Sequence, residues 1–583
     1  MNRRPATISL LLSALAIASC GSTAPASSEP DISTWTDVTR DVYSVAALKL
    51  EGNLQAAKMT TEHFKVNPAM PHILYCDLQT YFRCLLPSFP KKTTAEVTKD
   101  HVIVRVNGQN AFIGGIDTEN DRFYFVGSVG SDYAVPVDYS KTSLTLGSHI
   151  NGTSSGVKNE YTSYADYQNE IPVIEKSDAF YAPISLFDLA FKNAFGVYHF
   201  DNLESLYQIS STDDLKTPLD DSKALITNNV SRFYEANNSK VPDDLLALER
   251  AAFYCAFDAQ YGLAHSRNIN KMSDYFKDFG YDQDMLDSNK DLQAYGSLIA
   301  GLSDGHTAIS GIAPYWGDTA EEVPSSRFRY NMTSMKASLS SARAAAYKEH
   351  GGDPADSILY SDSGETAFIS FDSFSITYDA FEEDGKTPVA DLWKKDSFFY
   401  LAHQLAEIKN KGGVKRVIID DSCNGGGIVA VAMKILALIS RENKSRFYMY
   451  DWRKELLETY VTDVDSNLDG EFNLDDVYGD DFEIAILTSS YSFSCGNALP
   501  YLAKRHGHAK IIGLTSGGGE CVVGQTMLPS GRQITHSSNR LIVDYDASTH
   551  QVVTNAEAGA SPDIAITFDH FYDINALESY LEA

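Results

Sequence analysis

Three short polar segments of this 583-residue chain carry side chains that could act together as a serine hydrolase. Ser494 supplies a hydroxyl nucleophile, His306 supplies a general base, and Gly425–Gly427 supplies backbone N–H groups for an oxyanion. A serine nucleophile needs a neighbouring base to take its proton, and the anion formed on attack needs fixed hydrogen-bond donors. The combination therefore predicts acyl-transfer chemistry.

Ser494 follows the apolar run Ile484–Leu487 and opens a helix that we expect to reach Arg505. The first turn of a helix has unsatisfied N–H groups, so an alkoxide or oxyanion is favoured there and the Cys495 amide can face it. The alternative is that Ser494 only caps the helix. Pro500 lies inside the expected helix and is predicted to kink or shorten it.

The glycine segment Gly425–Gly427 follows the strand-like run Val417–Ile419 and precedes another helical stretch. Glycines at such a junction let N–H groups approach a ligand closely, which suits an oxyanion hole or an anion cradle. We expect the amides of Gly426, Gly427 and Cys495 to bind the oxyanion, where one lost donor costs roughly 2.7–4 kcal/mol. The segment fits a phosphate loop poorly, because neither lysine nor Ser/Thr follows at the required spacing. A plain tight turn is the alternative.

His306 is the favoured base among fourteen histidines because it lies in the polar turn Leu302–Thr307, where an imidazole can face a cleft. A positioned base contributes about 10²–10⁴-fold in rate. A single histidine is more often structural, so the assignment depends on the three segments occurring together.

The elements that would position these residues form an α/β layer in residues 364–583. Short apolar strands alternate with helices there, a pattern typical of a partly parallel sheet, and the chemistry should lie at the carboxyl ends of the strands. The expected strands are Ala367–Phe371, Val414–Ile419, Ile484–Leu487, Lys510–Gly513 and Leu541–Val543, and the expected helices are Phe398–Ile408 and Ile428–Ile439.

The preceding residues divide into three further regions. Residues 34–208 are rich in Tyr, Phe and Val between turns, which predicts a mostly-β domain. Within it, Phe180–Ile184 and the helical stretch that follows resemble the stalk domains of bacterial envelope enzymes. Residues 220–310 have apolar residues at helical spacing and predict a helical layer that ends in the histidine turn. Residues 311–363 are expected to be an insertion or linker.

Five motifs within residues 220–583 resemble, in order, those of the tail-specific or C-terminal-processing serine peptidases, including their tricorn-type Ser/His branch. The motifs are Asp304–Thr307, Asp420–Gly427, Ser494–Asn497, Gly513–Gly517 and Gly559–Asp563. The resemblance implies a crotonase/ClpP-like α/β peptidase core and an endopeptidase that acts on peptide or protein substrates. It implies no cofactor for catalysis.

Departures from the family pattern indicate which catalytic residues to expect. Members with a Ser/Lys pair carry a lysine where this chain has Gly518, so the base that the resemblance implies is His306. Ser/His members have a carboxylate shortly before the terminal Pro-Asp to orient the histidine. Glu557 is the candidate, although it lies one residue too close to the following glycine. Ser422 and Asn497 replace an arginine and a glutamate that are common in the family.

Two other functions remain open. One is a non-catalytic ligand- or peptide-binding envelope lipoprotein on the same fold. The other is an α/β-hydrolase esterase, since Ser492–Gly496 is one residue from the Gly-x-Ser-x-Gly elbow. That fold places its histidine after the serine, which would make His536 or His550 the base.

The segment Asp465–Asp476 has the oxygen spacing of an EF-hand-like calcium loop. Oxygen-bearing side chains occur at positions 1, 3, 5, 9 and 12, with glycine at 6 and an apolar residue at 8. We expect a structural calcium ion, and an acidic loop without metal is the alternative. The expected ligands are Asp465, Asn467, Asp469, Glu471 and Asp476.

Residues 1–20 predict a cleaved lipoprotein signal peptide. Arg3 and Arg4 precede an apolar run too short to span a bilayer, and Ile17–Cys20 resembles a bacterial lipobox, in which the cysteine is lipidated. Residues 21–33 are expected to be a flexible tether. These features predict an envelope protein, anchored through the Cys20 lipid to the extracytoplasmic side of a bacterial membrane. An ordinary signal peptide is the alternative.

The formal net charge of −30 argues against nucleic acid or an anionic lipid surface as the main partner, because the protein would repel phosphates. Six cysteines follow the signal, and in an exported protein disulfides are permitted. The short separation of Cys76 and Cys84 suggests a local disulfide, whereas Cys423, Cys495 and Cys521 are expected to be buried free thiols. The sequence leaves the oligomeric state open.

Overall fold

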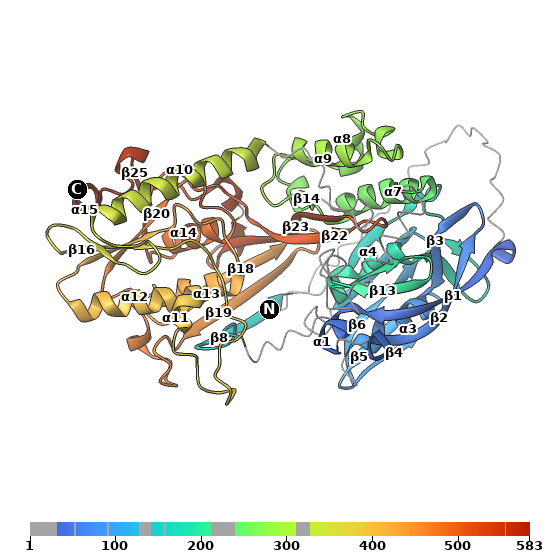
Figure 1. Ribbon diagram of the computed structural model, residues 1–583, viewed down its shortest axis with the longest axis horizontal. Coiled ribbons are helices and arrows are strands. Elements are labelled where there is room, and N and C mark those ends of the chain that lie inside the picture. Colours follow the sequence, from blue (N-terminus) through green and yellow to red (C-terminus); the bar gives the residue numbers. More distant parts are fainter. Residues whose placement is uncertain are drawn as a thin grey trace, which may run out of the picture.

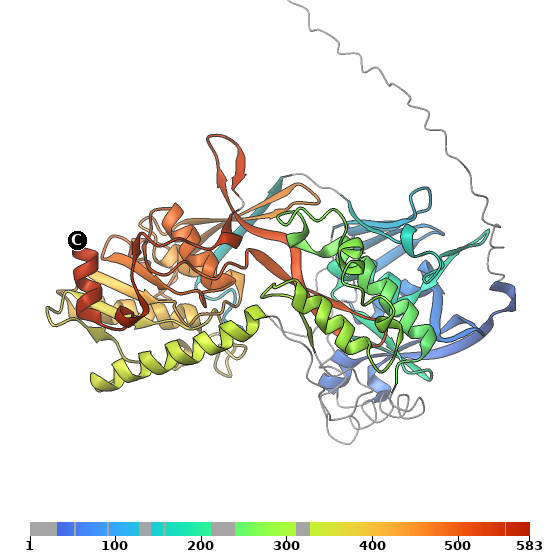
Figure 2. The ribbon, with the colours of Figure 1, turned by 90° about the horizontal axis from the view of Figure 1, so that it is seen from above.

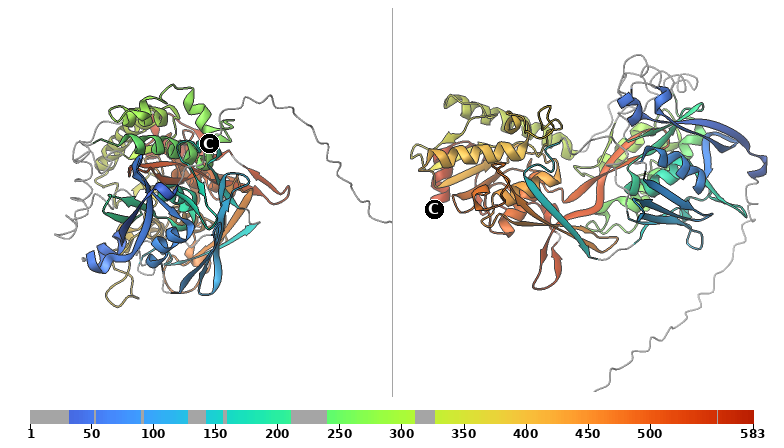
Figure 3. Two further views of the ribbon diagram at one scale, coloured as in Figure 1. Left: turned by 90° about the vertical axis from the view of Figure 1, so that its right-hand side faces the viewer. Right: turned by 90° about the horizontal axis from the view of Figure 1, so that it is seen from below.

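The computed structural model describes residues 32–51, 54–89, 92–127, 142–155, 159–210, 240–310, 327–553 and 555–583. The molecule is elongated, with an N-terminal half and a C-terminal half lying end to end (Figure 1). One long strand, β23 (Gln533–Asp546), runs from one half into the other (Figures 1 and 3). The predicted signal with Cys20, and most of the predicted tether, lie outside the described residues.

In the described residues, the C-terminal half is built on a six-stranded sheet that confirms the predicted α/β layer. Neighbouring strands from β16 to β25 are parallel, so their carboxyl ends share one edge. Both faces are covered, which is why strands such as β17 are continuous apolar runs. The order is β15 (Leu359–Tyr360), β16 (Thr366–Ser370), β17 (Arg416–Asp420), β20 (Glu483–Thr488), β21 (Lys510–Gly513) and β25 (Ile564–Ala565).

Helices join and cover these strands, and α10 runs along the outside of the C-terminal half (Figure 2). Asp396 caps α12 by accepting hydrogen bonds from the amides of Phe398 (2.9 Å) and Phe399 (3.0 Å). Helix α14 reaches Arg505 as predicted, and Pro500 inside it does not shorten it. The helices are α10 (Arg327–Glu349), α11 (Leu392–Lys395), α12 (Ser397–Lys411), α13 (Val429–Leu438), α14 (Cys495–Arg505) and α15 (Ile574–Glu582).

A second sheet contains strands from distant parts of the chain. The expected strand Leu541–Val543 is not part of the parallel sheet: it belongs to β23 and pairs antiparallel with β18. A short apolar run does not reveal which sheet it joins, and here the strand is long enough to contact both halves. The order is β14 (Ala308–Ser310), β23, β18 (Ser445–Asp451), β19 (Leu456–Val464) and β8 (Ser148–Ser155), with β22 (Cys521–Met527) and β24 (Gln551–Val553) also on β23.

The N-terminal half is β-rich, as predicted. Aromatic side chains fill its core, and pairs among Phe82, Phe112, Phe191 and Phe195 have ring centroids 4.8–6.1 Å apart. One sheet has the order β10 (Ile174–Glu175), β11 (Phe180–Pro183), β3 (Met70–Asp77), β2 (Lys58–Asn67), β1 (Thr36–Ser44), β13 (Ser205–Ile209) and β12 (Tyr198–Asp201). Another has the order β4 (Thr93–Val97), β5 (His101–Val106), β6 (Gln109–Asp117), β7 (Arg122–Gly127) and β9 (Glu160–Ser163). The helices are α1 (Val45–Glu51), α2 (Leu54–Ala57), α3 (Leu78–Leu85) and α4 (Ile184–Phe195).

The helical layer lies over the N-terminal half and contains α7 (Asp243–Gln260), α8 (Met272–Lys277) and α9 (Asp291–Gly301) (Figure 1). Arg532, just before β23, forms buried ion pairs with Glu249 (2.8 Å) and Asp291 (2.6 Å) of this layer. Because α9 ends just before the His306 turn, these ion pairs help to fix where the turn emerges. Among the helices of the described residues, none is long and apolar enough to cross a membrane.

Each cysteine within the described ranges is a buried free thiol. The disulfide suggested for Cys76 and Cys84 is therefore wrong: one residue lies in β3, the other in α3, and both pack in the apolar core as small hydrophobic side chains. The expectation of buried free thiols at Cys423, Cys495 and Cys521 is confirmed.

Candidate active site

Ser494 lies on a strained turn between β20 and α14. Its backbone has φ 58° and ψ −120°, a sparsely populated conformation that costs about 1–3 kcal/mol in a residue other than glycine. Serine nucleophiles at sharp strand-to-helix turns are strained because such a turn exposes the hydroxyl. The Ser494 side chain forms no capping hydrogen bond with α14, which argues against the alternative that it is only a helix cap.

The glycine segment packs directly against Ser494. Gly426 has φ 104°, and a Cβ at this position would lie 2.7 Å from the Ser494 Cβ and 3.0 Å from the Cys495 nitrogen. Gly427 has φ 146°, and a Cβ there would lie 2.4 Å from the Phe374 carbonyl oxygen. Both the backbone angles and the space therefore require glycine, and the main chain of this segment touches the serine.

The amides near Ser494 differ in whether they are already hydrogen bonded. The Gly426 N–H donates to Asn424 Oδ1 at 2.9 Å, so this expected oxyanion donor is engaged. Within the described part of the chain, the N–H groups of Gly427 and Cys495 donate to no other group. Those two amides are the ones available to an oxyanion at Ser494.

His306 lies beside the residue that precedes the serine. Its ring centroid is 4.7 Å from that of Phe493, and its Nδ1 is 3.5 Å from the Ser537 hydroxyl. Asp304 holds the turn: its carboxylate accepts from the His306 amide at 3.0 Å and from the Thr307 hydroxyl at 2.5 Å. The fold thus brings His306 against Phe493, the residue before Ser494, although the two segments are far apart in sequence.

Glu557 is held by the loop that lies beneath Ser494. Its Oε2 accepts from the amides of Gly519 and Glu520, each at 3.0 Å, and the Ser494 amide donates to the Gly518 carbonyl oxygen at 2.9 Å. Burial raises the pKa of Glu557, and the negative charge of Asp304 adds to this effect. Glu557 is therefore within electrostatic reach of the His306 turn.

Asn497 and Ser516 connect the helix of the serine to the loop of Glu557. The Asn497 Nδ2 donates to the Ala556 carbonyl oxygen at 2.8 Å, and its Oδ1 accepts from the Ser516 hydroxyl at 2.7 Å. The sequence motifs include both residues, but their spacing does not indicate these contacts. Ser537 and Glu520 carry no motif signal and become visible only in the folded protein.

The cation near the glycine segment comes from α10. Ser422 stands where the family commonly has arginine, and its hydroxyl contacts the Tyr572 hydroxyl at 2.8 Å. Arg343 of α10 instead reaches Asp420 at 3.2 Å and Asp372 at 2.6 Å. Burial raises the pKa of the Asp420 carboxyl, and the Arg343 guanidinium opposes that shift.

A comparison with protein families adds to this geometry. Residues 376–566 match the family model for peptidase family S41. The chain carries an S41 peptidase domain. The matched range includes the glycine segment, Ser494 and Glu557, whereas His306 lies before it.

Several solved structures are similar to parts of this chain. The photosystem II D1 C-terminal processing protease has 13% identity and a TM-score of 0.24, and the similarity covers 36% of this chain and 46% of that chain. A lipoprotein from Streptococcus agalactiae has 12% identity and a TM-score of 0.33, and the similarity covers 57% of this chain and 96% of the lipoprotein. Mature CPAF has 11% identity and a TM-score of 0.35, and the similarity covers 58% of this chain and 96% of CPAF. No curated protein sequence matches the chain.

The two histidines considered for the esterase alternative lie in other surroundings. His536 is buried in β23, with Nε2 3.3 Å from the Thr526 hydroxyl, and burial lowers its pKa to about 3. His550 contacts the Tyr545 hydroxyl at 3.0 Å in the turn between β23 and β24. The ring that the fold places against Phe493 is that of His306.

Two acidic side chains of the calcium-like loop, Asp465 and Asp476, are buried and accept hydrogen bonds from backbone amides of the loop. Asp465 accepts from the amides of Asp469 (3.1 Å) and Gly470 (2.9 Å), and Asp476 accepts from those of Ser466 (2.9 Å) and Asn473 (3.0 Å). Among the described residues, no group of three or more His, Cys, Asp or Glu side chains is arranged to hold a metal ion. Calcium therefore stays a prediction from the sequence spacing.

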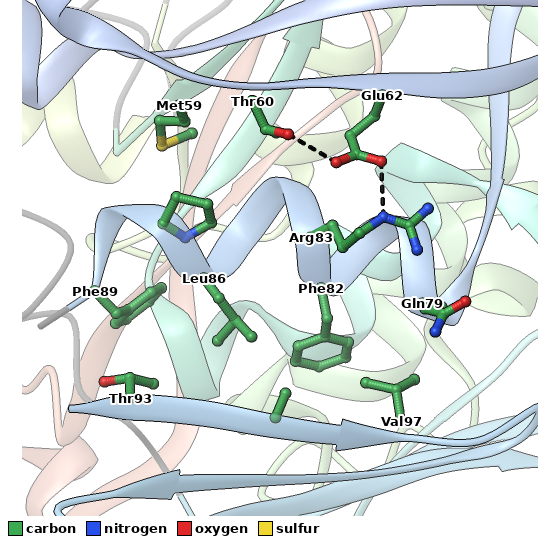
Figure 4. Close-up of a pocket in the computed structure, with 12 residues that line it drawn as sticks. Met59, Thr60, Glu62, Gln79, Phe82, Arg83, Leu86, Phe89, Thr93 and Val97 are labelled. Atoms are coloured by element: carbon green, nitrogen blue, oxygen red, sulfur yellow. Dashed lines mark hydrogen bonds and ion pairs between the residues drawn. The ribbon is translucent and has the colours of Figure 1, made fainter. Parts of the chain in front are cut away.

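A cavity of about 610 Å³ lies in the N-terminal half, between α3 and the β4 strand (Figure 4). Phe82 and Leu86 form part of its apolar wall. At its polar end Glu62 accepts from Arg83 at 2.7 Å and from Thr60 at 2.8 Å, so these groups satisfy one another. The cavity wall contains no residue of the five sequence motifs, so the candidate active site lies elsewhere.

Proposed function

We propose that this S41 peptidase is a serine endopeptidase with Ser494 as nucleophile, His306 as general base and Glu557 as the residue that orients the histidine. The observation that carries the proposal is the backbone of Ser494, with φ 58° and ψ −120°, against the glycine segment. Strain of this kind persists only where the surrounding structure enforces it, and it exposes a hydroxyl for attack. The contact between the His306 and Phe493 rings supports the choice of base.

In the proposed reaction, Ser494 Oγ adds to the carbonyl carbon of a peptide bond while His306 takes its proton. The amides of Cys495 and Gly427 donate to the oxyanion, and the engaged Gly426 amide holds the segment in shape. The imidazolium then protonates the leaving amine, and water activated by the same imidazole hydrolyses the acyl-enzyme.

The proposed role of Glu557 is to stabilise the imidazolium that forms during each step. Two amides donate to one of its oxygens, which favours the ionised carboxylate. The Ser537 hydroxyl lies 3.5 Å from His306 Nδ1 and supports the ring at that nitrogen. The proton moves only between serine, histidine and substrate, because the carboxylate acts by charge.

A fluorophosphonate probe tests this function without knowledge of the natural substrate. Folded wild-type protein and Ser490→Ala, which changes a serine in the same turn, should be labelled, whereas Ser494→Ala should not. Absence of labelling in folded wild type would instead support the non-catalytic binding protein. Labelled protein that cleaves esters but no peptide library would support the esterase.

We also propose that the enzyme is exported and anchored by lipid on Cys20 to the extracytoplasmic side of a bacterial membrane. The basic start, the short apolar run and the Ile17–Cys20 ending support this, together with the polar tether at residues 21–33. Its substrates would be peptides or proteins of that compartment. The net charge of −30 disfavours nucleic acid as a partner.

The loop Asp465–Asp476 is proposed to bind one structural calcium ion through Asp465, Asn467, Asp469, Asp476 and the Glu471 carbonyl. Oxygen ligands on a glycine-containing loop suit calcium, and Gly470 has φ 88°, as the sharp bend requires. The loop contacts the residue just before β8: the Asp465 amide donates to the Gly147 carbonyl oxygen at 3.0 Å. An ion here would therefore stabilise the attachment of β8 to the C-terminal half.

A further inference from the structure

Glu520 is a buried carboxyl group that the proposed mechanism does not use. It lies between the glycine loop Gly517–Gly519 and the first residue of β22, and only 2% of its surface is exposed. Within the described residues it forms no ion pair with a lysine, arginine or histidine. A buried carboxyl without a cation needs another explanation, because burial penalises its charged form.

Glu520 and Glu557 hold each other through reciprocal hydrogen bonds. The Glu520 amide donates to Glu557 Oε2 at 3.0 Å, and the Glu557 amide donates to Glu520 Oε2 at 3.2 Å. The two residues are 37 positions apart, so the pair joins two separate loops. We call this arrangement the glutamate clamp.

The glutamate clamp is connected to the nucleophile through the glycine loop. The Ser494 amide donates to the Gly518 carbonyl oxygen at 2.9 Å. A Cβ on Gly518 would lie 2.3 Å from the Glu557 carbonyl oxygen, and one on Gly519 would lie 3.0 Å from the Ser494 nitrogen. The loop is thus packed between Glu557 and Ser494, and a shift of the clamp must move the serine.

The clamp distributes charge unequally between its two carboxyl groups. The two amides that donate to Glu557 Oε2 lie at 3.0 Å each, whereas the Glu557 amide lies 3.2 Å from Glu520 Oε2, so the shorter hydrogen bonds stabilise the single negative charge on Glu557. Burial, and then the charge of Glu557, raise the pKa of Glu520 to about 7. The other titratable groups facing the clamp are Cys521 on β22, Tyr501 on α14, and Asp304 and Arg267 of the helical layer.

We propose that Glu520 is a positioning residue of the active site, whose neutral carboxyl group keeps the negative charge on Glu557 and fixes the loop that holds Ser494. This inference rests on the proposed function of Ser494 and Glu557. When Glu520 ionises, two carboxylates repel each other in one buried place, the clamp loosens and the nucleophile shifts. A displacement of about 1 Å at a catalytic group costs about 10²-fold in rate.

The rate of fluorophosphonate labelling between pH 5.5 and 8.5 tests the inference on the full chain. The labelling rate of wild type should fall above about pH 7 as Glu520 ionises. Glu520→Gln keeps the acceptor of the clamp and cannot ionise, so its labelling should lack the falling limb. Glu520→Ala, which removes the acceptor, should label about 10²-fold more slowly at every pH. The exposed Glu383→Gln should behave as wild type.

Thermal melting of the same variants gives a readout that does not depend on activity. The folded protein keeps the Glu520 proton up to about pH 7, whereas the unfolded chain releases it near 4.5, so wild type loses stability as pH rises through that window. Glu520→Gln should lose less stability over the same range. Superimposable pH profiles and parallel melting curves for wild type and Glu520→Gln would overturn the inference. Unlabelled wild type with diverging melting curves would overturn the proposed function and leave the clamp supported.

Discussion

Arg343 on α10 and Asp420 at the carboxyl end of β17 form a buried ion pair, with 3.2 Å between Nη1 and Oδ2. Their side chains are 5% and 0% exposed. The same guanidinium binds both oxygens of Asp372, at the end of the neighbouring strand β16, at 2.6 Å each. One arginine therefore ties together the ends of β16 and β17, and β17 leads into the glycine segment.

The first prediction is that Arg343→Met destabilises the protein by about 3–5 kcal/mol, because it leaves the buried Asp420 carboxylate without a cation. Denaturant unfolding at neutral pH measures the change. Lys395→Met, which breaks an exposed pair with Asp391, is the matched control and should unfold like wild type. Equal midpoints for the two variants would show that the pair does not support this edge of the sheet.

The second prediction concerns the strain at Ser494. Glycine adopts φ 58° and ψ −120° without steric cost, so Ser494→Gly should relieve strain of about 1–3 kcal/mol, less about 0.5–1 kcal/mol for the greater freedom of the unfolded glycine. Ser494→Ala keeps the strain and is the control. Both variants lose the nucleophile, and Ser494→Gly should be more stable by about 1 kcal/mol in chemical denaturation. A Ser494→Gly protein no more stable than Ser494→Ala would mean that the turn is not strained.

The sequence predicts the parallel sheet well because its strands are buried on both faces. Continuous apolar runs such as Val414–Ile419 and Ile484–Leu487 correspond to β17 and β20, and Gly425–Gly427 and Ser494 follow them at the expected edge. The local sequence pattern is sufficient to predict these strands, because each apolar run by itself indicates a strand that is buried on both faces. The Ser494 conformation carries no such signal, because any residue type can be forced into it by its surroundings.

Contacts between distant segments could not be predicted from the sequence. The pairing of β8 with β19, the contact of Arg343 with Asp420 and the glutamate clamp each join residues that no spacing rule connects. The Gly426 amide is a further example: its backbone position was expected, but its hydrogen bond to Asn424 depends on one side-chain orientation. Such details follow from tertiary packing.

The third prediction is that the mature protein begins at a lipidated Cys20. Expression in a bacterial host with an intact lipoprotein pathway, followed by mass spectrometry of the mature N-terminus, should find a diacylated cysteine. Cys20→Ser should abolish the lipid and release the protein from the membrane fraction. A free N-terminus cut at another residue would contradict lipid anchoring and leave an ordinary signal peptide.

The fourth prediction is that calcium stabilises the loop Asp465–Asp476 and the β8 strand packed on it. Free calcium at about 100 times its dissociation constant should stabilise the linked region by roughly 2.7 kcal/mol if only the folded loop binds it. The His149 ring of β8 stacks on Phe472 at 4.0 Å, so chelation should also expose β8 to proteolysis. Melting scans in chelator and in excess calcium measure this stabilisation. Asp469→Asn weakens the calcium site and should be stabilised less by calcium than wild type. Identical scans with no bound metal would leave an ordinary acidic loop.

The central claim is that Ser494 and His306 act together although they are 188 positions apart in the sequence. The most direct measurement is the intact mass of folded protein after fluorophosphonate treatment, compared among wild type, His306→Ala, His536→Ala and His550→Ala. We predict one probe adduct on Ser494 in wild type, in His536→Ala and in His550→Ala, and none in His306→Ala over the same time. Full labelling of His306→Ala with loss of labelling in His536→Ala or His550→Ala would contradict the account.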